Sequence, residues 1–310
     1  MNNLHTPGGA PISRFCFGAM QFGGKADEAT SQALYDACRA AGLNFFDTAY
    51  VYAEGRSETY LGRAAKDERD DVFIASKANF AAGSGTAGIR ASVEESRRRL
   101  GMDFIDLYYL HRFDDNVPLE ETFTALAGEV EAGRIGAVGV SNFAAWQVMK
   151  AERAANAVGL HIAMIQPMYN LVKRQVEVEI LPMALSEGFA VVPYSPLGGG
   201  LLSGKYAAGQ SGRLKEDKAY AGRYAPEWMH RAAADLSALA AELGTHPATL
   251  AVAWVARHPG VTAPIISARS VEQLAPSLAA LDYPLDDALY ARLSALTPAP
   301  PPATDRLEEA

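Results

Sequence analysis

Short apolar runs alternate with longer helix-forming stretches along almost the whole chain. Eight runs have the β-branched and aromatic composition of buried strands, and they occupy residues 15–18, 43–46, 72–76, 104–110, 135–140, 162–166, 190–194 and 263–266. Helix-forming stretches lie between them, for example at residues 28–41, 88–100, 120–131 and 143–158. This repetition predicts an α/β fold with parallel strands, and eight repeats favour a closed (β/α)8 TIM barrel. A doubly wound open sheet is the alternative, because periodicity alone does not show closure.

Composition shows no break that would mark a second domain. The chain has 310 residues, of which 49% are apolar, and single barrels of about this length are common. We therefore predict one domain over residues 1–310, with a short N-terminal extension and an extra C-terminal segment. Four prolines between residues 298 and 302 disfavour a helix, so we predict a flexible tail at residues 298–310.

Charge and cysteine content exclude several classes of function. The net charge is −8, and the longest basic run, at residues 97–99, follows two glutamates, so no nucleic-acid partner is expected. Cys16 and Cys38 give no disulfide framework, and the N-terminus does not resemble a signal peptide, which predicts a cytoplasmic location. No apolar stretch reaches about 18 residues, so no membrane insertion is expected. The oligomeric state stays open.

Four ionisable side chains follow the ends of three successive strand runs. Asp47 and Tyr52 come after residues 43–46, Lys77 comes after 72–76, and His111 comes after 104–110. Parallel strands of a barrel end on the same face, so these side chains should meet in one pocket. We refer to Asp47, Tyr52, Lys77 and His111 as the proton-transfer set. The other histidines show no metal-ligand spacing around His111, and no metal site is predicted.

This set has the chemistry to move a proton onto a carbonyl oxygen. A free tyrosine has a pKa near ~10, and a nearby Lys77 ammonium is expected to lower the pKa of Tyr52. Asp47 would supply the counter-charge for Lys77, and His111 would hydrogen-bond the carbonyl. None of these groups carries hydride, which implies a nicotinamide cofactor and a small-molecule carbonyl substrate. Taken singly, each residue also has an ordinary structural interpretation, and it is their joint placement that favours the chemical one.

Two glycine-rich segments resemble phosphate-binding motifs. Residues 83–88 match G-x-G-x-x-G, but five residues separate them from the strand end at Lys77, so we interpret them as a loop between strand and helix. Residues 199–206 nearly match the P-loop, with Tyr206 where a hydroxyl side chain would bind magnesium. Nucleotide hydrolysis is therefore not expected. The glycines and Lys205 make this second segment a candidate phosphate site, with a glycine-rich turn as the alternative.

Three segments resemble the aldo-keto reductase family. Residues 44–58, NFFDTAYVYAEGRSE, look like the family signature around its catalytic Asp and Tyr, which match Asp47 and Tyr52 rather than Tyr50. Residues 74–77 and 106–112 match the motifs of the catalytic Lys and His. The resemblance implies a (β/α)8 barrel that binds NADP(H), with NAD(H) as the alternative. It also implies reversible reduction of aldehydes or ketones to alcohols, with Tyr52 as the general acid.

The resemblance extends to the branch of the family that contains potassium-channel β-subunits. It therefore implies a second function, that of a cofactor-binding, redox-sensing auxiliary subunit of a membrane channel with little turnover. A lyase or isomerase barrel without a redox role is a third interpretation.

The resemblance also implies a set of cofactor contacts. Residues 133–143 look like the segment that binds the nicotinamide carboxamide, and Tyr194 matches the aromatic residue that stacks on the nicotinamide ring. Residues 265–274 resemble the segment that grips the adenosine 2′-phosphate, with Ser267 in place of a usual glycine and Ser277 in place of a common asparagine. The implied cofactor set is Gly18, Met20, Ser141, Asn142, Gln166, Tyr194, Ser195, Leu197, Gly199, Lys205, Ser267, Arg269 and Gln273.

Overall fold

Eight parallel strands form the centre of the protein in the computed structural model, which describes residues 4–206, 209, 211–306 and 308. From β1 to β7 each strand pairs with the next along the chain, and β8 pairs with β1. The strands are β1 Cys16–Gly18, β2 Phe45–Asp47, β3 Phe73–Lys77, β4 Ile105–Leu110, β5 Ile135–Ser141, β6 Ile162–Gln166, β7 Ala190–Val191 and β8 Ile265–Ile266.

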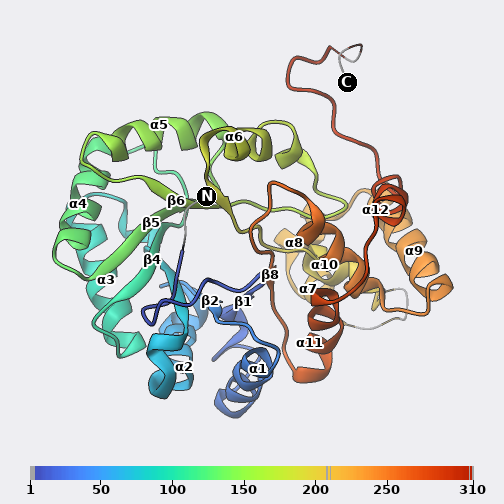
Figure 1. Ribbon diagram of the computed structural model, residues 1–310, viewed down its shortest axis with the longest axis horizontal. Helices are drawn as coiled ribbons and strands as arrows, with labels where there is room; N and C mark the ends of the chain where they lie inside the picture. The colour runs from blue at the N-terminus through green and yellow to red at the C-terminus, as the bar shows by residue number, and fades with distance from the viewer. Residues whose placement is uncertain (1–3, 207–208, 210, 307, 309–310) are drawn as a thin grey trace.

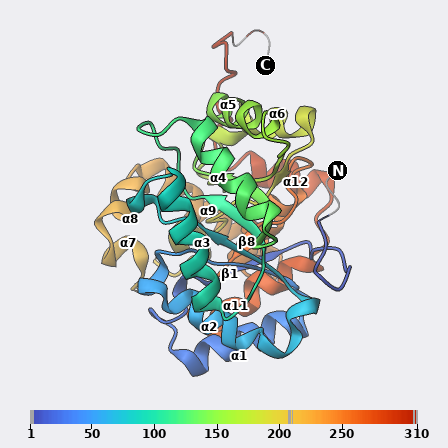
Figure 2. The same cartoon turned by 90° about the vertical axis from the view of Figure 1, so that its left-hand side faces the viewer.

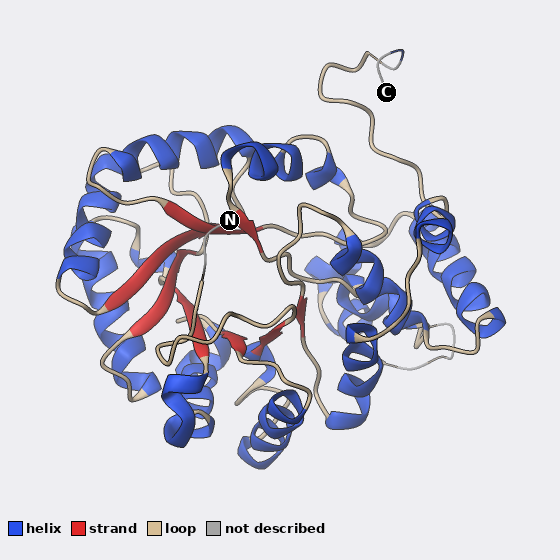
Figure 3. Cartoon of the chain, viewed as in Figure 1, coloured by secondary structure: helices blue, strands red, loops and turns tan. Residues whose placement is uncertain are grey.

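Backbone hydrogen bonds close the sheet between its two outer strands. Thr262 N donates to Val191 O at 2.8 Å, and Ile265 N donates to Pro193 O at 2.9 Å. Figure 3 shows the strands curling around a common centre with the helices outside them. The prediction of a (β/α)8 barrel is therefore confirmed, and the open doubly wound sheet is excluded.

Helices surround the barrel and connect its strands (Figures 1 and 2). Side chains and glycines at the helix ends determine where the helices begin and stop. At the start of α1, Asp27 Oδ1 accepts a hydrogen bond from the Thr30 amide at 2.8 Å. At the end of α3, Gly101 follows with a left-handed backbone, φ +65°. The helices are α1 Glu28–Ala40, α2 Arg56–Ala64, α3 Thr86–Leu100, α4 Leu119–Glu131, α5 Ala145–Asn156, α6 Ile180–Glu187, α7 Arg213–Glu216, α8 Lys218–Arg223, α9 Glu227–Glu242, α10 Pro247–Arg257, α11 Val271–Leu278 and α12 Asp287–Ser294.

The strand expected at residues 190–194 is regular only over its first two residues. Pro193 has no amide hydrogen for a regular ladder, but pairing with the chain around β6 continues on both sides of it. Val192 N donates to Ile165 O and Tyr194 N donates to Pro167 O, both at 2.9 Å. Tyr194 is therefore held at the end of an extended strand-like segment.

The two ends of the chain lie differently against the barrel. Leu4 and Ile12 pack against the inner barrel cluster around Phe45 and Leu107, and Ile12 N donates to Leu4 O at 3.2 Å. Residues 298–306 run away from the barrel without regular structure (Figure 1). Residues 1–3 of the predicted extension and 307, 309 and 310 of the predicted tail lie outside the described residues. Among the helices described, none has the length and apolar character needed to cross a membrane.

Candidate active site

The proton-transfer set lies at the C-terminal ends of three adjacent strands. Asp47 is the last residue of β2, Lys77 is the last residue of β3, and His111 directly follows β4. Tyr52 begins the 3₁₀-helix Tyr52–Gly55 after β2. All of these side chains except Lys77 line one cavity of 1070 Å³.

Lys77 lies completely buried behind the cavity wall. Its ammonium donates hydrogen bonds to Asp47 Oδ1 and, at 2.8 Å, to Thr48 O, and Nζ lies 5.1 Å from the centroid of the Tyr52 ring. Burial lowers the pKa of Lys77, but Asp47 and Tyr52 raise it more, so the pKa is above its ordinary value. Lys77 is therefore an ammonium at neutral pH, held against both Asp47 and Tyr52.

Tyr52 keeps its proton at neutral pH. Burial raises the pKa of the phenol above its ordinary value, and the Lys77 ammonium opposes this shift without overcoming it. The sequence-based expectation of a lowered pKa for Tyr52 is therefore wrong for this structure, because the desolvation of a buried phenolate outweighs the attraction of one ammonium. The protonated phenol is the form that can donate a proton.

His111 is a neutral imidazole that packs against the Tyr52 ring. Burial lowers the pKa of His111 to about 3, and the positive charges of Lys77 and Arg112 add to the shift. The ring meets Tyr52 edge to face at 5.8 Å between centroids, and it meets Phe80 in the same way at 5.4 Å. A neutral imidazole has one N–H group to donate and one nitrogen to accept.

Polar residues at the ends of β5 and β6 form a hydrogen-bonded network beside the proton-transfer set. Ser141 Oγ donates to Gln166 O at 3.0 Å, and Asn142 Nδ2 donates to His111 O at 3.0 Å. The Tyr194 hydroxyl donates to Asn142 Oδ1 at 2.7 Å. Asn142 adopts a left-handed backbone, with φ +59°, and such conformations persist where surrounding contacts hold them.

The opposite end of the cavity gathers positive charge around a glycine-rich backbone. Gly199 and Gly200 have φ +66° and +95°, and a Cβ at Gly200 would lie 2.5 Å from Lys205 Cε. Lys205, Arg213 and Arg269, here called the cation cluster, all line this end. Burial lowers the pKa of Lys205, and the charges of Arg269 and Arg213 lower it further.

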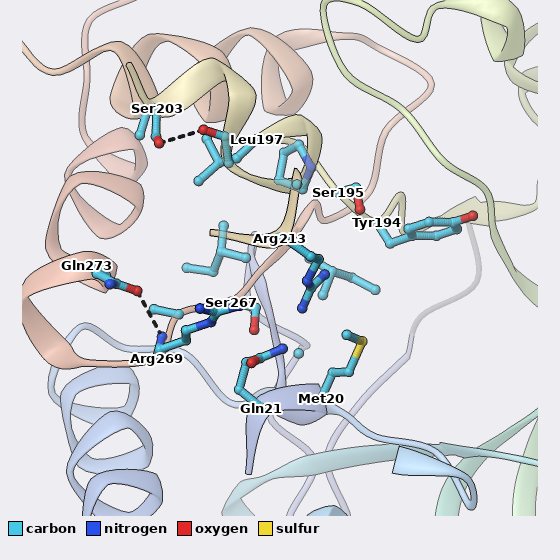
Figure 4. Close-up of a pocket in the computed structure, with 18 of the residues that line it drawn as sticks. Met20, Gln21, Tyr194, Ser195, Leu197, Ser203, Arg213, Ser267, Arg269 and Gln273 are labelled. Atoms are coloured by element: carbon cyan, nitrogen blue, oxygen red, sulfur yellow. Dashed lines mark hydrogen bonds between the residues drawn. The ribbon is translucent and has the colours of Figure 1, made fainter. Parts of the chain in front are cut away.

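This arrangement fits a phosphate-bearing ligand. Arg269 Nη2 lies 3.2 Å from Glu216 Oε2, and among the described residues Lys205 has no ion pair. Half-buried like charges repel one another, so a polyanion between them would be stabilising. Figure 4 shows Arg213 and Arg269 directed into the cavity, with Gln273 Oε1 accepting the Arg269 amide at 3.3 Å.

Every residue of the implied cofactor set lines this single cavity. The cavity also contains Tyr220, from α8, and two residues that the sequence did not single out, Arg213, from α7, and Gln21. No motif marks Arg213 or Gln21; Arg213 and Tyr220 lie in a segment, residues 196–225, that is rich in Gly, Lys and Arg.

The G-x-G-x-x-G segment lies elsewhere: residues 83–85 are in the loop between β3 and α3, as expected, but residues 86–88 already form the first turn of α3. Its amide groups are already engaged by carboxylates: Ser84 N donates to Asp114 Oδ2 at 3.0 Å, and Thr86 N donates to Glu121 Oε1 at 2.9 Å. This segment does not line the cavity and does not provide a phosphate site.

Comparison with known proteins agrees with the fold. A sequence model described as the aldo/keto reductase family matches residues 14–298. The chain is 34% identical over 312 residues to the uncharacterized oxidoreductase YrpG of Bacillus subtilis (strain 168), covering 94% of each chain. It is 36% identical to a probable voltage-gated potassium channel subunit beta of Oryza sativa, over 88% of this chain and 89% of that one. It is 33% identical to norsolorinic acid reductase of Emericella nidulans, over 90% of this chain and 76% of that one.

Proposed function

This chain belongs to the aldo/keto reductase family, and from that membership we propose that it reduces aldehydes or ketones to alcohols with NADPH. The observation that carries the proposal is the meeting of a protonated Tyr52 phenol and a neutral His111 imidazole in the cavity that also holds the cation cluster. Proton donors for a carbonyl oxygen thus share one cavity with a site suited to phosphates.

The cavity residues fit a nicotinamide dinucleotide. The cavity volume of 1070 Å³ reaches the upper end of the range of ligand pockets. Tyr194 offers an aromatic ring near the proton-transfer set. The left-handed glycines and the cation cluster would hold the phosphates. Ser141, Asn142 and Gln166 would hold the carboxamide. When bound, the cofactor supplies the hydride that a carbonyl carbon accepts.

The residues of the chain supply the proton. Tyr52 donates its phenolic proton to the carbonyl oxygen, and the buried Lys77 ammonium stabilises the phenolate that remains. Asp47 fixes Lys77 in place through their hydrogen bond. The neutral His111 donates an N–H to the same carbonyl oxygen and orients it. In the oxidation of an alcohol, the Tyr52 phenolate takes the proton back.

NADPH is the proposed cofactor rather than NADH because of the adenosine end of the cavity. Arg269 presents a planar fork of donors that suits a phosphate, and Lys205 adds a second positive charge beside it. A 2′-phosphate would bring negative charge to Lys205, which has no ion pair within the described part of the chain, and would compete with Glu216 for Arg269.

The test is a spectrophotometric assay with the purified protein and a panel of small aldehydes, ketones and quinones. We expect consumption of NADPH that depends on the carbonyl compound, with slower consumption of NADH. Failure to consume either cofactor across the panel would overturn the proposed reductase.

A second function, a redox-sensing auxiliary subunit of a membrane channel, is favoured by one observation. Probable voltage-gated potassium channel subunits beta from rice and from Arabidopsis thaliana are 36% and 33% identical to this chain. Tight binding of NADPH without turnover, together with co-purification with a channel protein, would favour this function over the reductase.

A further inference from the structure

The loop that carries Tyr52 has an unusual backbone. Ala53 and Glu54 have left-handed conformations, with φ +48° and +57°, and Gly55 follows with φ +90°. Left-handed conformations are unfavourable for residues with a side chain and persist where neighbouring structure imposes them. We call residues 48–55 the donor loop, because they contain the proposed proton donor. The geometry of this loop therefore depends on contacts from outside it.

Arg99, near the end of α3, provides such contacts from beneath the loop. Its Nη1 donates to Tyr50 O at 2.8 Å, and the guanidinium carbon lies 4.2 Å from the centroid of the Tyr50 ring. The loop also closes tightly over the guanidinium, since a Cβ at Gly55 would lie 2.5 Å from Arg99 Cζ. Arg99 thus contacts the donor loop on both sides of the proposed proton donor.

The same guanidinium is linked, through the Glu58 carboxylate of α2, to the strand that carries Lys77. Arg99 Nη1 also donates to Glu58 Oε2 at 3.2 Å, and the Glu58 side chain is fully buried. The other oxygen, Glu58 Oε1, accepts a hydrogen bond from Ser76 Oγ at 2.6 Å, and Ser76 directly precedes Lys77 in β3. Arg99 Nε donates to Glu95 Oε1 at 2.7 Å within α3. One arginine therefore ties the donor loop to β3.

We propose that Arg99 is a positioning residue. It holds the Tyr52 hydroxyl at a fixed position relative to Lys77, through the Tyr50 carbonyl and the Glu58–Ser76 pair. The expected effects of Arg99 on kcat rest on the proposed reductase activity. Arg99 itself does not line the cavity, so it acts on the reaction through the donor loop and not through the substrate or the cofactor.

Two variants separate positioning from folding. Arg99→Lys keeps a positive charge beside the buried Glu58 carboxylate, but a single ammonium lacks the planar fork that serves Tyr50, Glu58 and Glu95 together. Arg99→Ala combined with Glu58→Gln removes both charges, so that no buried carboxylate is left unpaired. The matched control is Arg98→Ala, because Arg98 also pairs with Glu95 but its side chain is 70% exposed.

The expected result is a split between turnover and binding. In both Arg99 variants kcat should fall at least tenfold, while the NADPH dissociation constant, measured by fluorescence titration, should stay within twofold of wild type. Arg98→Ala should keep the wild-type kcat. Values of kcat within twofold of wild type in both Arg99 variants would overturn the proposal, and so would a parallel loss of kcat and NADPH affinity.

Hydrogen exchange by mass spectrometry tests the same inference without turnover. Peptides covering residues 48–55 should exchange at least tenfold faster in Arg99→Lys than in Arg98→Ala, with the rest of the barrel unchanged. Unchanged exchange in the donor loop would overturn the positioning role. If the wild-type protein reduces no carbonyl compound, the proposed function fails, and exchange in the donor loop still decides the role of Arg99.

Discussion

Gln166 and Asp47 are 119 residues apart in the chain, yet Gln166 Nε2 donates a 2.8 Å hydrogen bond to Asp47 Oδ2. This bond joins the ends of β6 and β2 across the mouth of the barrel. Asp47 uses its other oxygen for Lys77, so the carboxylate links a residue of the implied cofactor set to the proton-transfer set. A displacement of Gln166 therefore acts on the same carboxylate that holds the Lys77 ammonium.

Replacement of Tyr52 by phenylalanine should remove reduction and leave cofactor binding intact. Loss of a general acid typically lowers the rate by about 10²- to 10⁴-fold, and we expect kcat to fall within that range. NADPH affinity should remain, because the ring is preserved. Tyr50→Phe is the matched control and should keep the wild-type kcat. Lost NADPH binding in Tyr52→Phe would show that the phenol is structural.

Replacement of Lys77 by methionine should destabilise the fold as well as abolish turnover. The variant leaves the Asp47 carboxylate buried without its counter-charge, which typically costs about 3–5 kcal/mol. The urea midpoint of unfolding should fall accordingly. Lys77→Met combined with Asp47→Asn should recover much of this stability without recovering activity. An unchanged midpoint in the single variant would contradict the buried ion pair.

His111 should make stability depend on pH in a defined window. Its pKa is about 3 in the folded protein and near ~6.5 in the unfolded chain. Between these values the unfolded state binds more protons, so stability falls as the pH falls from about 6.5 towards 3. The urea midpoint of the wild-type protein should therefore drop more between pH 7 and pH 5 than that of His111→Gln. Equal drops would show that His111 titrates alike in both states.

Arg269 should determine the preference between the two nicotinamide cofactors. Loss of a charge-assisted hydrogen bond costs about 1.5–3 kcal/mol, so Arg269→Ala should raise the NADPH dissociation constant by about 10- to 100-fold. NADH has no 2′-phosphate, and its dissociation constant should change little. Arg231→Ala, which removes a charge that is paired with Glu227 on α9, is the control. An equal effect on both cofactors would contradict a role for Arg269 at the 2′-phosphate.

The sequence predicted the placement of the site well where strand ends determine it. Asp47 and Lys77 end their strands, and His111 directly follows its strand, because short apolar runs mark both the strands and their direction. The sequence did not predict the protonation of Tyr52. The pKa of a phenol depends on how completely water is excluded from it, and burial is a property of the packed barrel rather than of neighbouring residues.

The remaining errors lie where the chain leaves the strands. Residues 196–225 include the short helices α7 and α8, which the pattern of strands and helices in the sequence did not indicate. These helices bring Arg213 and Tyr220 to the cavity. Helices this short have no extended periodicity to detect, and long-range contacts determine where their side chains point.

Lys77 does not reach the cavity, and this separates the chemical step from the choice of substrate. Under the proposed function, a substrate would meet Tyr52 and His111 in the cavity, whereas the Lys77 ammonium lies buried behind its wall. Changes in the loops at residues 112–118 or 198–225 can therefore reshape the entrance without altering the charge behind the donor. For protein engineering, this makes the barrel a scaffold on which selectivity for the substrate can be redesigned while the proton-transfer set stays in place.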